Sequence, residues 1–145
     1  MTRPRIEEGV ARAGRRAHVE IAAGPLIATG PDAKTVEAER RKAHETLVFT
    51  LSTPAYWPAL EHHGWRDVGE RLLRCTREGR WNDMPALVTD EIVDAFVPSG
   101  PYGEIADRVI DLYGGVADSI LFPVPDDPAH DAAVRGVVEK LRAAG

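Results

Sequence analysis

The chain has 145 residues, of which 43% are hydrophobic and 28% charged, as in ordinary globular domains that bury a core. Its formal net charge is -5 and its basic residues are spread along the sequence, which argues against nucleic acid or an anionic membrane as the main partner. Cys75 is the only cysteine, so an internal disulfide and a thiolate metal cluster are excluded. The first residues show no signal-peptide pattern, and no apolar run approaches the roughly 20 residues that span a bilayer. We therefore expect one soluble, cytoplasmic domain over residues 1–145.

The first third of the chain predicts a helix, a strand and a long helix. Residues 6–15 have helical apolar spacing. Residues 19–21 and 25–28 predict one strand, bent at the glycine that lies between the two runs. Asp32 is the expected N-cap of the longest helix, residues 33–51.

Only helices are expected between this strand and the next one. Thr53-Pro54 begins a short helix that ends near Gly64, and an amphipathic segment runs from Trp65 to Gly79. Two further helical turns are expected at residues 81–84 and 89–92. Residues 32–95 are therefore a helical excursion, far longer than an ordinary connection between strands.

The stretch from residue 95 to residue 122 predicts a strand, a crossover helix and a second strand. The apolar runs 95–97 and 120–122 are the strands. Ser99 or Gly100 is expected to cap the helix, with Pro101 in its first turn. Its apolar face consists of four residues: Ile105, Val109, Leu112 and Tyr113. Such a βαβ unit implies parallel strands.

A final helix completes an α/β pattern of about three strands. Asp126-Asp127-Pro128 caps this helix, and its expected inward residues are Val134, Val137, Val138 and Leu141. Three parallel strands leave both sheet edges open, a hazard that proteins normally cover. Either a second copy completes the sheet or the chain is part of a barrel.

An ordered series of short segments supports the second alternative. The segments are 7–15 (EEGVARAGR), 52–58 (STPAYWP), 60–65 (LEHHGW), 79–81 (GRW), 89–91 (TDE), 94–96 (DAF) and 113–118 (YGGVAD). Together they resemble the luciferase-like monooxygenases, and more narrowly the branch assigned to the deazaflavin coenzyme F420. The resemblance covers residues from about 5 to about 123.

The resemblance implies a helix-rich C-terminal part of a TIM-type (β/α)8 barrel. A complete barrel takes about 250 residues, so the resemblance implies that an N-terminal half with most catalytic side chains is missing. We therefore name no catalytic residue. A fragment, a truncated reading frame and a remnant gene remain as alternatives. The implied cofactor is coenzyme F420 or FMN, and the implied substrate is a small molecule.

Two pairs of residues are the candidates for binding. Ser99 and Gly100 would bind a cofactor phosphate, because a glycine at a helix N-terminus exposes backbone N–H groups to an anion; the alternative is that they only cap the helix. By resemblance, Tyr56 and Trp57 lie over the barrel mouth and would wall the substrate pocket. Packing between short helices is the alternative for these two.

The remaining chemically interesting side chains favour structural roles. Adjacent histidines point about 100° apart on a helix and do not easily share one metal ion, so we expect no metal site. His62 and His63 are nevertheless the first histidines to test as acids or bases. Surface or structural roles are expected for the others: His18, His44 and His130. Packing roles are expected for Cys75, Trp65 and Trp81.

Three functional hypotheses follow. The first is a luciferase-like oxidoreductase, here truncated, that transfers a hydride or uses reduced flavin and oxygen. The second is a non-catalytic half-barrel stabilised by self-association, for example as a homodimer. The third is a helical protein-interaction module built on residues 32–95.

Overall fold

The computed structural model describes residues 2–14 and 19–144. The helices are α1 (Thr2–Arg12), α2 (Ala33–Leu51), α3 (Trp57–His62), α4 (Arg66–Arg77), α5 (Asp90–Phe96), α6 (Ile105–Tyr113) and α7 (Asp131–Ala143). The 3-10 turns are η1 (Pro54–Tyr56), η2 (Trp81–Asp83), η3 (Pro85–Leu87) and η4 (Pro128–His130). The strands are β1 (Ala22–Ala23), β2 (Ala28–Gly30), β3 (Ser99–Pro101) and β4 (Ser119–Ile120). Within the described part of the chain, no helix is both long and apolar enough to cross a membrane.

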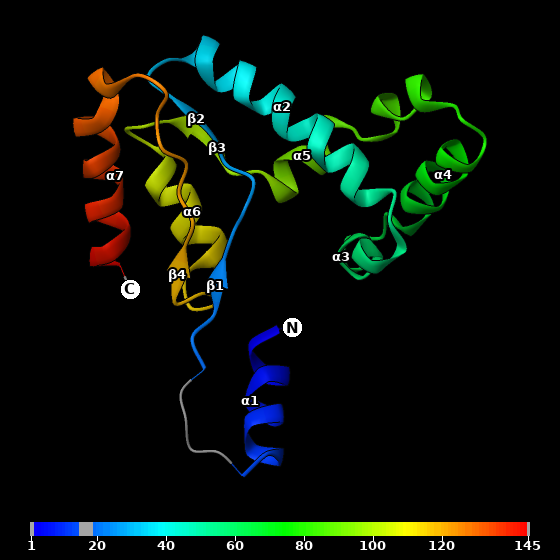
Figure 1. Ribbon diagram of the computed structural model, residues 1–145, viewed down its shortest axis with the longest axis horizontal. Helices are drawn as coiled ribbons and strands as arrows, with labels where there is room; N and C mark the ends of the chain where they lie inside the picture. The colour runs from blue at the N-terminus through cyan, green and yellow to red at the C-terminus, as the bar shows by residue number, and fades with distance from the viewer. Residues whose placement is uncertain (1, 15–18, 145) are drawn as a thin grey trace.

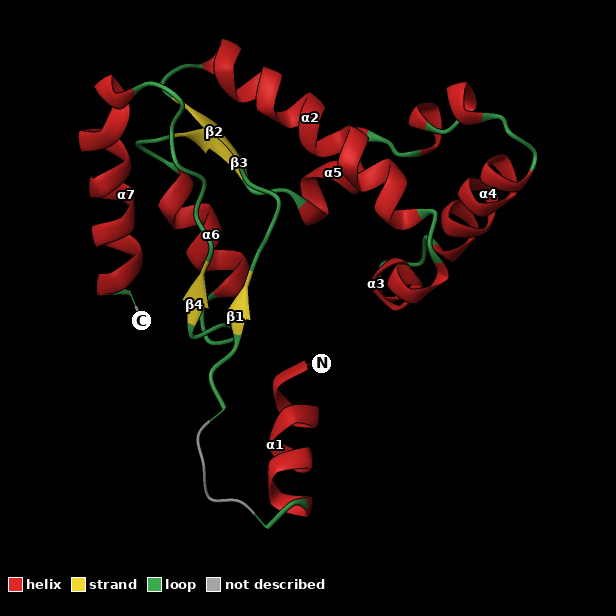
Figure 2. Cartoon of the chain, viewed as in Figure 1, coloured by secondary structure: helices red, strands yellow, loops and turns green. Residues whose placement is uncertain are grey.

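The strands form two short parallel pairs (Figure 2). In one pair β1 lies beside β4, with Ala22 opposite Ser119. In the other pair β2 lies beside β3, with Thr29 opposite Gly100. The parallel direction is as predicted, but β3 and β4, which flank α6, pair with β2 and β1 and not with each other. The strand predicted at residues 120–122 is observed as β4 at Ser119–Ile120. The expected bent strand over residues 19–28 instead divides into β1 and β2, which pair with different partners.

The predicted strand at residues 95–97 is wrong. Ala95 and Phe96 are the last residues of α5, and Val97 is its C-cap. The helix extends this far because Ile92, Val93 and Val97 repeat at helical spacing and are 1–2% exposed. The strand begins only at Ser99, so β3 and the helix after it both lie further along the chain than predicted.

The expected helices of the excursion are present. α2 has the predicted bounds, and the Thr35 backbone N donates to the Asp32 carboxylate over 2.8 Å, which confirms the N-cap. Gly64 and Gly79, after α3 and α4, have φ angles of 78° and 71°. This left-handed backbone conformation favours glycine and ends each helix.

The excursion and the strands share one apolar core. Leu60 of α3 and Leu72 of α4 are fully buried among residues of α2, of α5 and of the turns that connect α4 to α5. Ala28 of β2 and Val97 before β3 belong to the same cluster. Residues 32–95 therefore pack onto the β2–β3 pair. In Figure 1 they extend from above this pair, where α2 begins, to α3 and α4 on the right.

A second, smaller core lies between α6 and α7. Its buried residues are Ile105, Ala106, Val109 and Val137. Leu112, expected to point inward, is 44% exposed, and Ala106 is buried in its place. Because successive helical residues turn by about 100°, Leu112 lies at the edge of the arc that Ile105, Ala106 and Val109 define.

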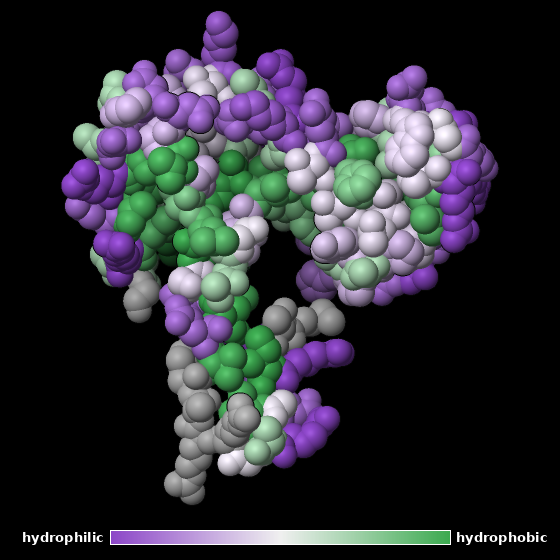
Figure 3. Space-filling model, viewed as in Figure 1, coloured by the Kyte–Doolittle hydropathy of each residue, from purple (hydrophilic) through white to green (hydrophobic). Residues whose placement is uncertain are grey.

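Helix α1 lies apart from both cores, near the β1–β4 pair (Figure 1). The Arg3 guanidinium bonds the Asp118 carboxylate over 2.8 Å and the Val116 carbonyl over 3.3 Å. These contacts join α1 to the loop before β4. Figure 3 shows apolar residues over the strands and α6, beneath the polar outer face of α2.

Candidate functional site

A pocket of about 400 Å³ lies where three strands end. It is bounded by the residues after β2, after β3 and after β4, and by the first turns of α2. The lining residues are Ile27, Thr29, Pro31, Thr35, Glu39, Lys42, Tyr102, Pro123, Val124, Pro125, Asp126, Asp127 and His130. These strand ends are carboxyl ends, the position at which barrel enzymes carry their chemistry.

Hydrogen bonds between strand ends hold this pocket in shape. The Thr29 hydroxyl, 8% exposed as a residue, donates to the Gly100 carbonyl over 2.8 Å. The Tyr102 backbone N donates to the Gly30 carbonyl over 3.0 Å. The first bond joins β2 to β3, and the second joins β2 to the residue that directly follows β3. The Tyr102 ring therefore projects from a backbone that is held in place.

The charged side chains of the pocket interact across its rim. Lys42 Nζ lies 2.7 Å from Glu39 Oε1, and this hydrogen bond raises the pKa of Lys42, with a smaller contribution from Asp126. Burial raises the pKa of Tyr102, and the charges of Asp126 and Glu39 raise it further. The Tyr102 hydroxyl therefore stays protonated at neutral pH and can donate a hydrogen bond.

Aromatic and apolar groups form the other side of the pocket. The His130 ring centroid lies 6.0 Å from that of Tyr102, with the two rings tilted by 53°. Ile27, Pro123 and Pro125 add apolar surface. A ligand with a flat, partly apolar ring and polar edges could pack against such a wall.

The same pocket does not suit a phosphate. Three carboxylates line it, those of Glu39, Asp126 and Asp127, whereas Lys42 contributes the one ammonium group among the described lining residues. That ammonium is already bonded to Glu39. Among the described residues of the pocket, no arginine is present to bind a phosphate bidentately. The residues present therefore fit the ring system of a flavin or deazaflavin but not its phosphate.

Ser99 and Gly100 do not lie at a helix N-terminus, because both belong to β3. The Ser99 hydroxyl donates to the Val97 carbonyl over 2.9 Å, and an Arg40 N–H donates to the same hydroxyl over 3.4 Å. Helix α6 begins only at Ile105. The helix-cap argument for these two residues is thus wrong, and their cofactor-binding role stays a prediction without that support.

Tyr56 and Trp57 lie at the start of α3, in the excursion. Tyr56 is 53% exposed. The Trp57 indole N–H donates to the Leu51 carbonyl over 3.1 Å, and the Arg66 guanidinium lies 5.3 Å from the centroid of the indole. Trp57 therefore packs within the helical excursion, in agreement with the alternative that it has a packing role. Neither residue is among the described residues that line the strand-end pocket. A substrate-binding role for them stays a prediction.

The other singled-out residues mostly have structural surroundings. His44 Nε2 lies 2.9 Å from the Val88 carbonyl oxygen, Cys75 is 3% exposed and Trp65 packs against the larger core. Trp81, expected to pack, is instead 53% exposed. His18 lies outside the described residues.

Sequence reasoning missed Tyr102 and Lys42 as pocket residues, and it predicted only a surface or structural role for His130. Tyr102 was missed because the strand before it was misplaced. Residues that directly follow a parallel strand are the first candidates for a pocket at the strand ends. With β3 placed at Ser99–Pro101, Tyr102 becomes the first residue after a strand. Lys42 gave no comparable signal, because it lies near the middle of α2 and does not follow a strand.

Comparison with known proteins gives a consistent result. A family model described as luciferase-like monooxygenase matches residues 1–119. Uncharacterized proteins of Mycobacterium tuberculosis (strain ATCC 25618 / H37Rv) and Mycobacterium bovis are each 36% identical over 119 residues, covering 81% of this chain and 35% of theirs. The chain thus spans about a third of the length of these curated relatives.

A solved structure also resembles the chain. The coenzyme F420 dependent tetrahydromethanopterin reductase from Methanopyrus kandleri matches with a TM-score of 0.65 and 21% identity. The match covers 97% of this chain and 40% of that protein. At this identity the likeness concerns the fold, and it confirms a helix-rich α/β chain of the TIM-barrel type.

Proposed function

This chain belongs to the luciferase-like monooxygenase family, and we propose from that premise that it forms the C-terminal part of a barrel oxidoreductase working with a deazaflavin or a flavin. The F420-dependent solved relative favours coenzyme F420, and FMN is the alternative. The substrate is a small molecule. A cytoplasmic location is part of the proposal, which the single cysteine favours.

The observation that carries the proposal is the pocket at the carboxyl ends of β2, β3 and β4. A bound flavin or deazaflavin supplies the hydride or electron chemistry, and the protein supplies orientation and exclusion of water. In this chain Tyr102 lines the pocket, and its hydroxyl would donate a hydrogen bond to a polar edge of the bound ring. The apolar side chains of Ile27 and Pro123 would pack against that ring and keep water from one side of it.

The ring system and the phosphate of the cofactor would be bound by different protein groups. The carboxylates of Glu39, Asp126 and Asp127 oppose a phosphate in the strand-end pocket. We therefore propose that this pocket contacts only the ring system. The phosphate requires cations from outside the pocket.

Fluorescence titration of the purified chain with riboflavin, FMN and F420 tests the proposal. We expect saturable binding of riboflavin, with FMN binding no more tightly, because its phosphate meets carboxylates. Tyr102→Phe should weaken riboflavin binding about three- to tenfold, the value of one hydrogen bond of about 1 kcal/mol. Tyr113→Phe removes a hydroxyl outside the pocket and is the matched control. Absence of saturable binding by all three ligands would refute the enzyme role of this chain.

A non-catalytic half-barrel that persists by self-association is the second candidate. The specific observation in its favour is Leu121, which follows β4 and is 71% exposed beside the open β1–β4 pair. A homodimer that covers this edge would remove the aggregation hazard of a short parallel sheet. The third hypothesis, an independent helical module at residues 32–95, has less support because its core also includes Ala28 and Val97.

A further inference from the structure

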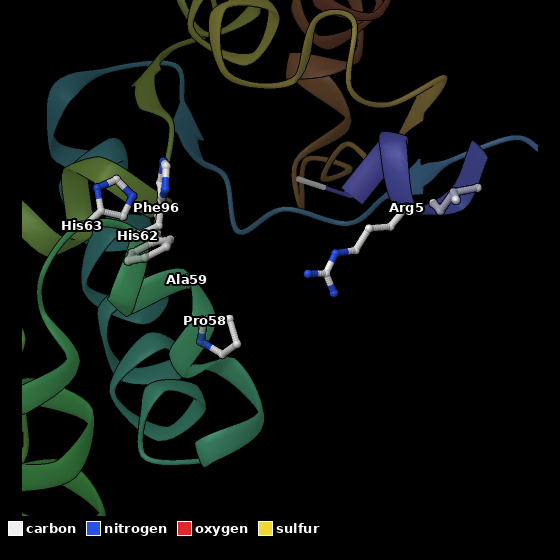
Figure 4. A pocket seen from close by; sticks show the side chains of 7 residues that line it. Arg5, Pro58, Ala59, His62, His63 and Phe96 are labelled. Carbon is white, nitrogen blue, oxygen red and sulfur yellow. The ribbon is translucent and has the colours of Figure 1, made fainter. Parts of the chain in front are cut away.

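A second cavity, of about 580 Å³, opens beside helix α3. It is separate from the strand-end pocket and shares no described lining residue with it. Its lining residues are Arg5, Ile6, Pro58, Ala59, His62, His63 and Phe96 (Figure 4). The adjacent histidines that stood out in the sequence therefore both face one cavity.

Helix geometry explains why these residues meet. Pro58, Ala59 and His62 lie three and four residues apart along α3, so they share one face. His63 is the C-cap of α3, and its ring stacks on the Trp65 indole with centroids 4.7 Å apart and planes 11° apart. The His63 ring also meets the Phe96 ring edge-on, with centroids 5.5 Å apart. These contacts fix the imidazole before any ligand arrives.

Helix α1 supplies the opposite wall and a permanent cation. The ion pair between Arg3 and Asp118 fastens α1 to the loop before β4. Two residues further along, the Arg5 guanidinium extends into the opening toward the side on which Pro58 and His62 lie (Figure 4). An exposed guanidinium offers a planar set of donors to a carboxylate or phosphate.

The charges around the cavity all favour an anion. Arg5, His62 and His63 can donate hydrogen bonds, and none of the described lining residues carries a carboxylate. Two acidic side chains of the elements that line the cavity have partners of their own. Glu61 of α3 pairs with Arg66. Asp94 of α5 pairs with Arg40 over 2.6 Å. This pattern is the opposite of that in the strand-end pocket, where carboxylates predominate.

We propose that this cavity binds a small organic anion with an apolar body, such as an aromatic carboxylate or a phosphate monoester. The apolar body would lie on Pro58, Ala59 and Phe96, and the anionic group would bond to Arg5 and the two histidines. Mostly apolar walls with a few converging polar groups are typical of small-molecule sites. The site goes beyond the proposed cofactor pocket and does not depend on it.

Isothermal titration of the full chain with four probes tests this proposal. The probes are 1-naphthyl phosphate, 1-naphthoate, the uncharged 1-naphthamide and inorganic phosphate. We expect at least one naphthyl anion to bind about tenfold more tightly than the amide, because its bonds to Arg5 are charge-assisted. Preference between the two anions identifies the group, phosphate or carboxylate. Equal affinity for anion and amide, or for inorganic phosphate and 1-naphthyl phosphate, would overturn the proposal.

Substitutions in helix α1 distinguish anion binding in this cavity from a general effect of the protein's net charge. Arg5→Gln should remove most of the preference for anions, whereas Arg5→Lys should keep much of it. Arg12→Gln is the matched control, because Arg12 lies on the same helix, is 76% exposed at its side chain and pairs with Glu8. His62→Gln with His63→Gln should also weaken anion binding. An unchanged anion preference in Arg5→Gln, with circular dichroism showing an intact fold, would contradict the assignment.

Discussion

At the residue scale, two helical glycines have opposite surroundings. A Cβ atom at Gly69, inside α4, would lie 2.6 Å from the Trp57 indole nitrogen and 2.9 Å from Leu60 Cδ1. A Cβ atom at Gly136, inside α7, would meet nothing within 4 Å. The close approach of α4 to α3 therefore depends on the absence of a side chain at Gly69.

Alanine at these two positions should change stability in opposite directions. Gly136→Ala should raise the free energy of unfolding by about 1 kcal/mol, since alanine is the better helix former. Gly69→Ala should lower it by up to about 2 kcal/mol, because overpacking costs about 1–3 kcal/mol and the better helix propensity of alanine returns only about 1 kcal/mol. Urea unfolding measures both values. A stabilised Gly69→Ala variant would show that Trp57 is not packed as described.

Asp32 gives a pH-dependent prediction. Hydrogen bonds from the backbone and hydroxyl of Thr35 lower its pKa below the ordinary value of 3.8. Because the folded-state pKa is the lower one, the stabilisation is present above the unfolded-state value and is lost as the pH falls through the folded-state value. Asp32→Ala should thus lower the thermal midpoint by a few degrees at pH 7 and by much less at pH 2.

Thr89→Ala is the control for Asp32, because Thr89 precedes α5 without a side-chain capping bond. Its effect on the thermal midpoint should be small and should not vary between the two pH values. An Asp32→Ala effect of equal size at pH 2 and pH 7 would rule out an ionised cap.

At the element scale, the sequence predicted helices better than strands. Helix α2 was predictable to the residue, because Asp32 and the apolar spacing mark it independently. The strands have only two or three residues each, too few for a period-2 pattern to develop. The run 95–97 consequently resembled a strand, although it ends α5. The Ser99 and Gly100 prediction failed for the same reason, since their helix-cap role depended on that strand.

Two substitutions in helix α6 test which of its faces is buried. Ile105→Ala should lower the free energy of unfolding by about 2–5 kcal/mol, because Ile105 is fully buried. Leu112→Ala, on the same helix but 44% exposed, should change it by less than about 1 kcal/mol. Chemical unfolding of the two variants decides between the faces. Comparable losses would mean that Leu112 is buried as the sequence spacing predicted.

At the scale of the whole molecule, residues 2–14 and 19–144 form two short strand pairs with open edges. The small core between α6 and α7 covers one side of them, and apolar residues remain on the viewed face (Figure 3). This arrangement is consistent with a chain that spans about a third of its curated relatives' length. Sequence reasoning predicted the open edges from the small number of strands, but not the division into two pairs, which depends on long-range pairing.

Self-association should follow from the exposed edge. We expect concentration-dependent oligomers in sedimentation velocity, reduced by Leu121→Asp, because Leu121 is 71% exposed beside the β1–β4 pair. Phe49→Asp is the matched control, since Phe49 is 67% exposed but lies on α2, away from that edge. A wild-type chain that stays monomeric at all concentrations would refute this prediction.

The central claim for the whole molecule is that its strand-end pocket contacts the ring system of the cofactor. The most direct measurement is the mapping of riboflavin-induced chemical-shift changes on the isotope-labelled full chain. We expect the largest changes at Thr29, Tyr102 and His130, with those at His62 and His63 much smaller. Changes confined to the α3 cavity, or none that saturate, would contradict the claim.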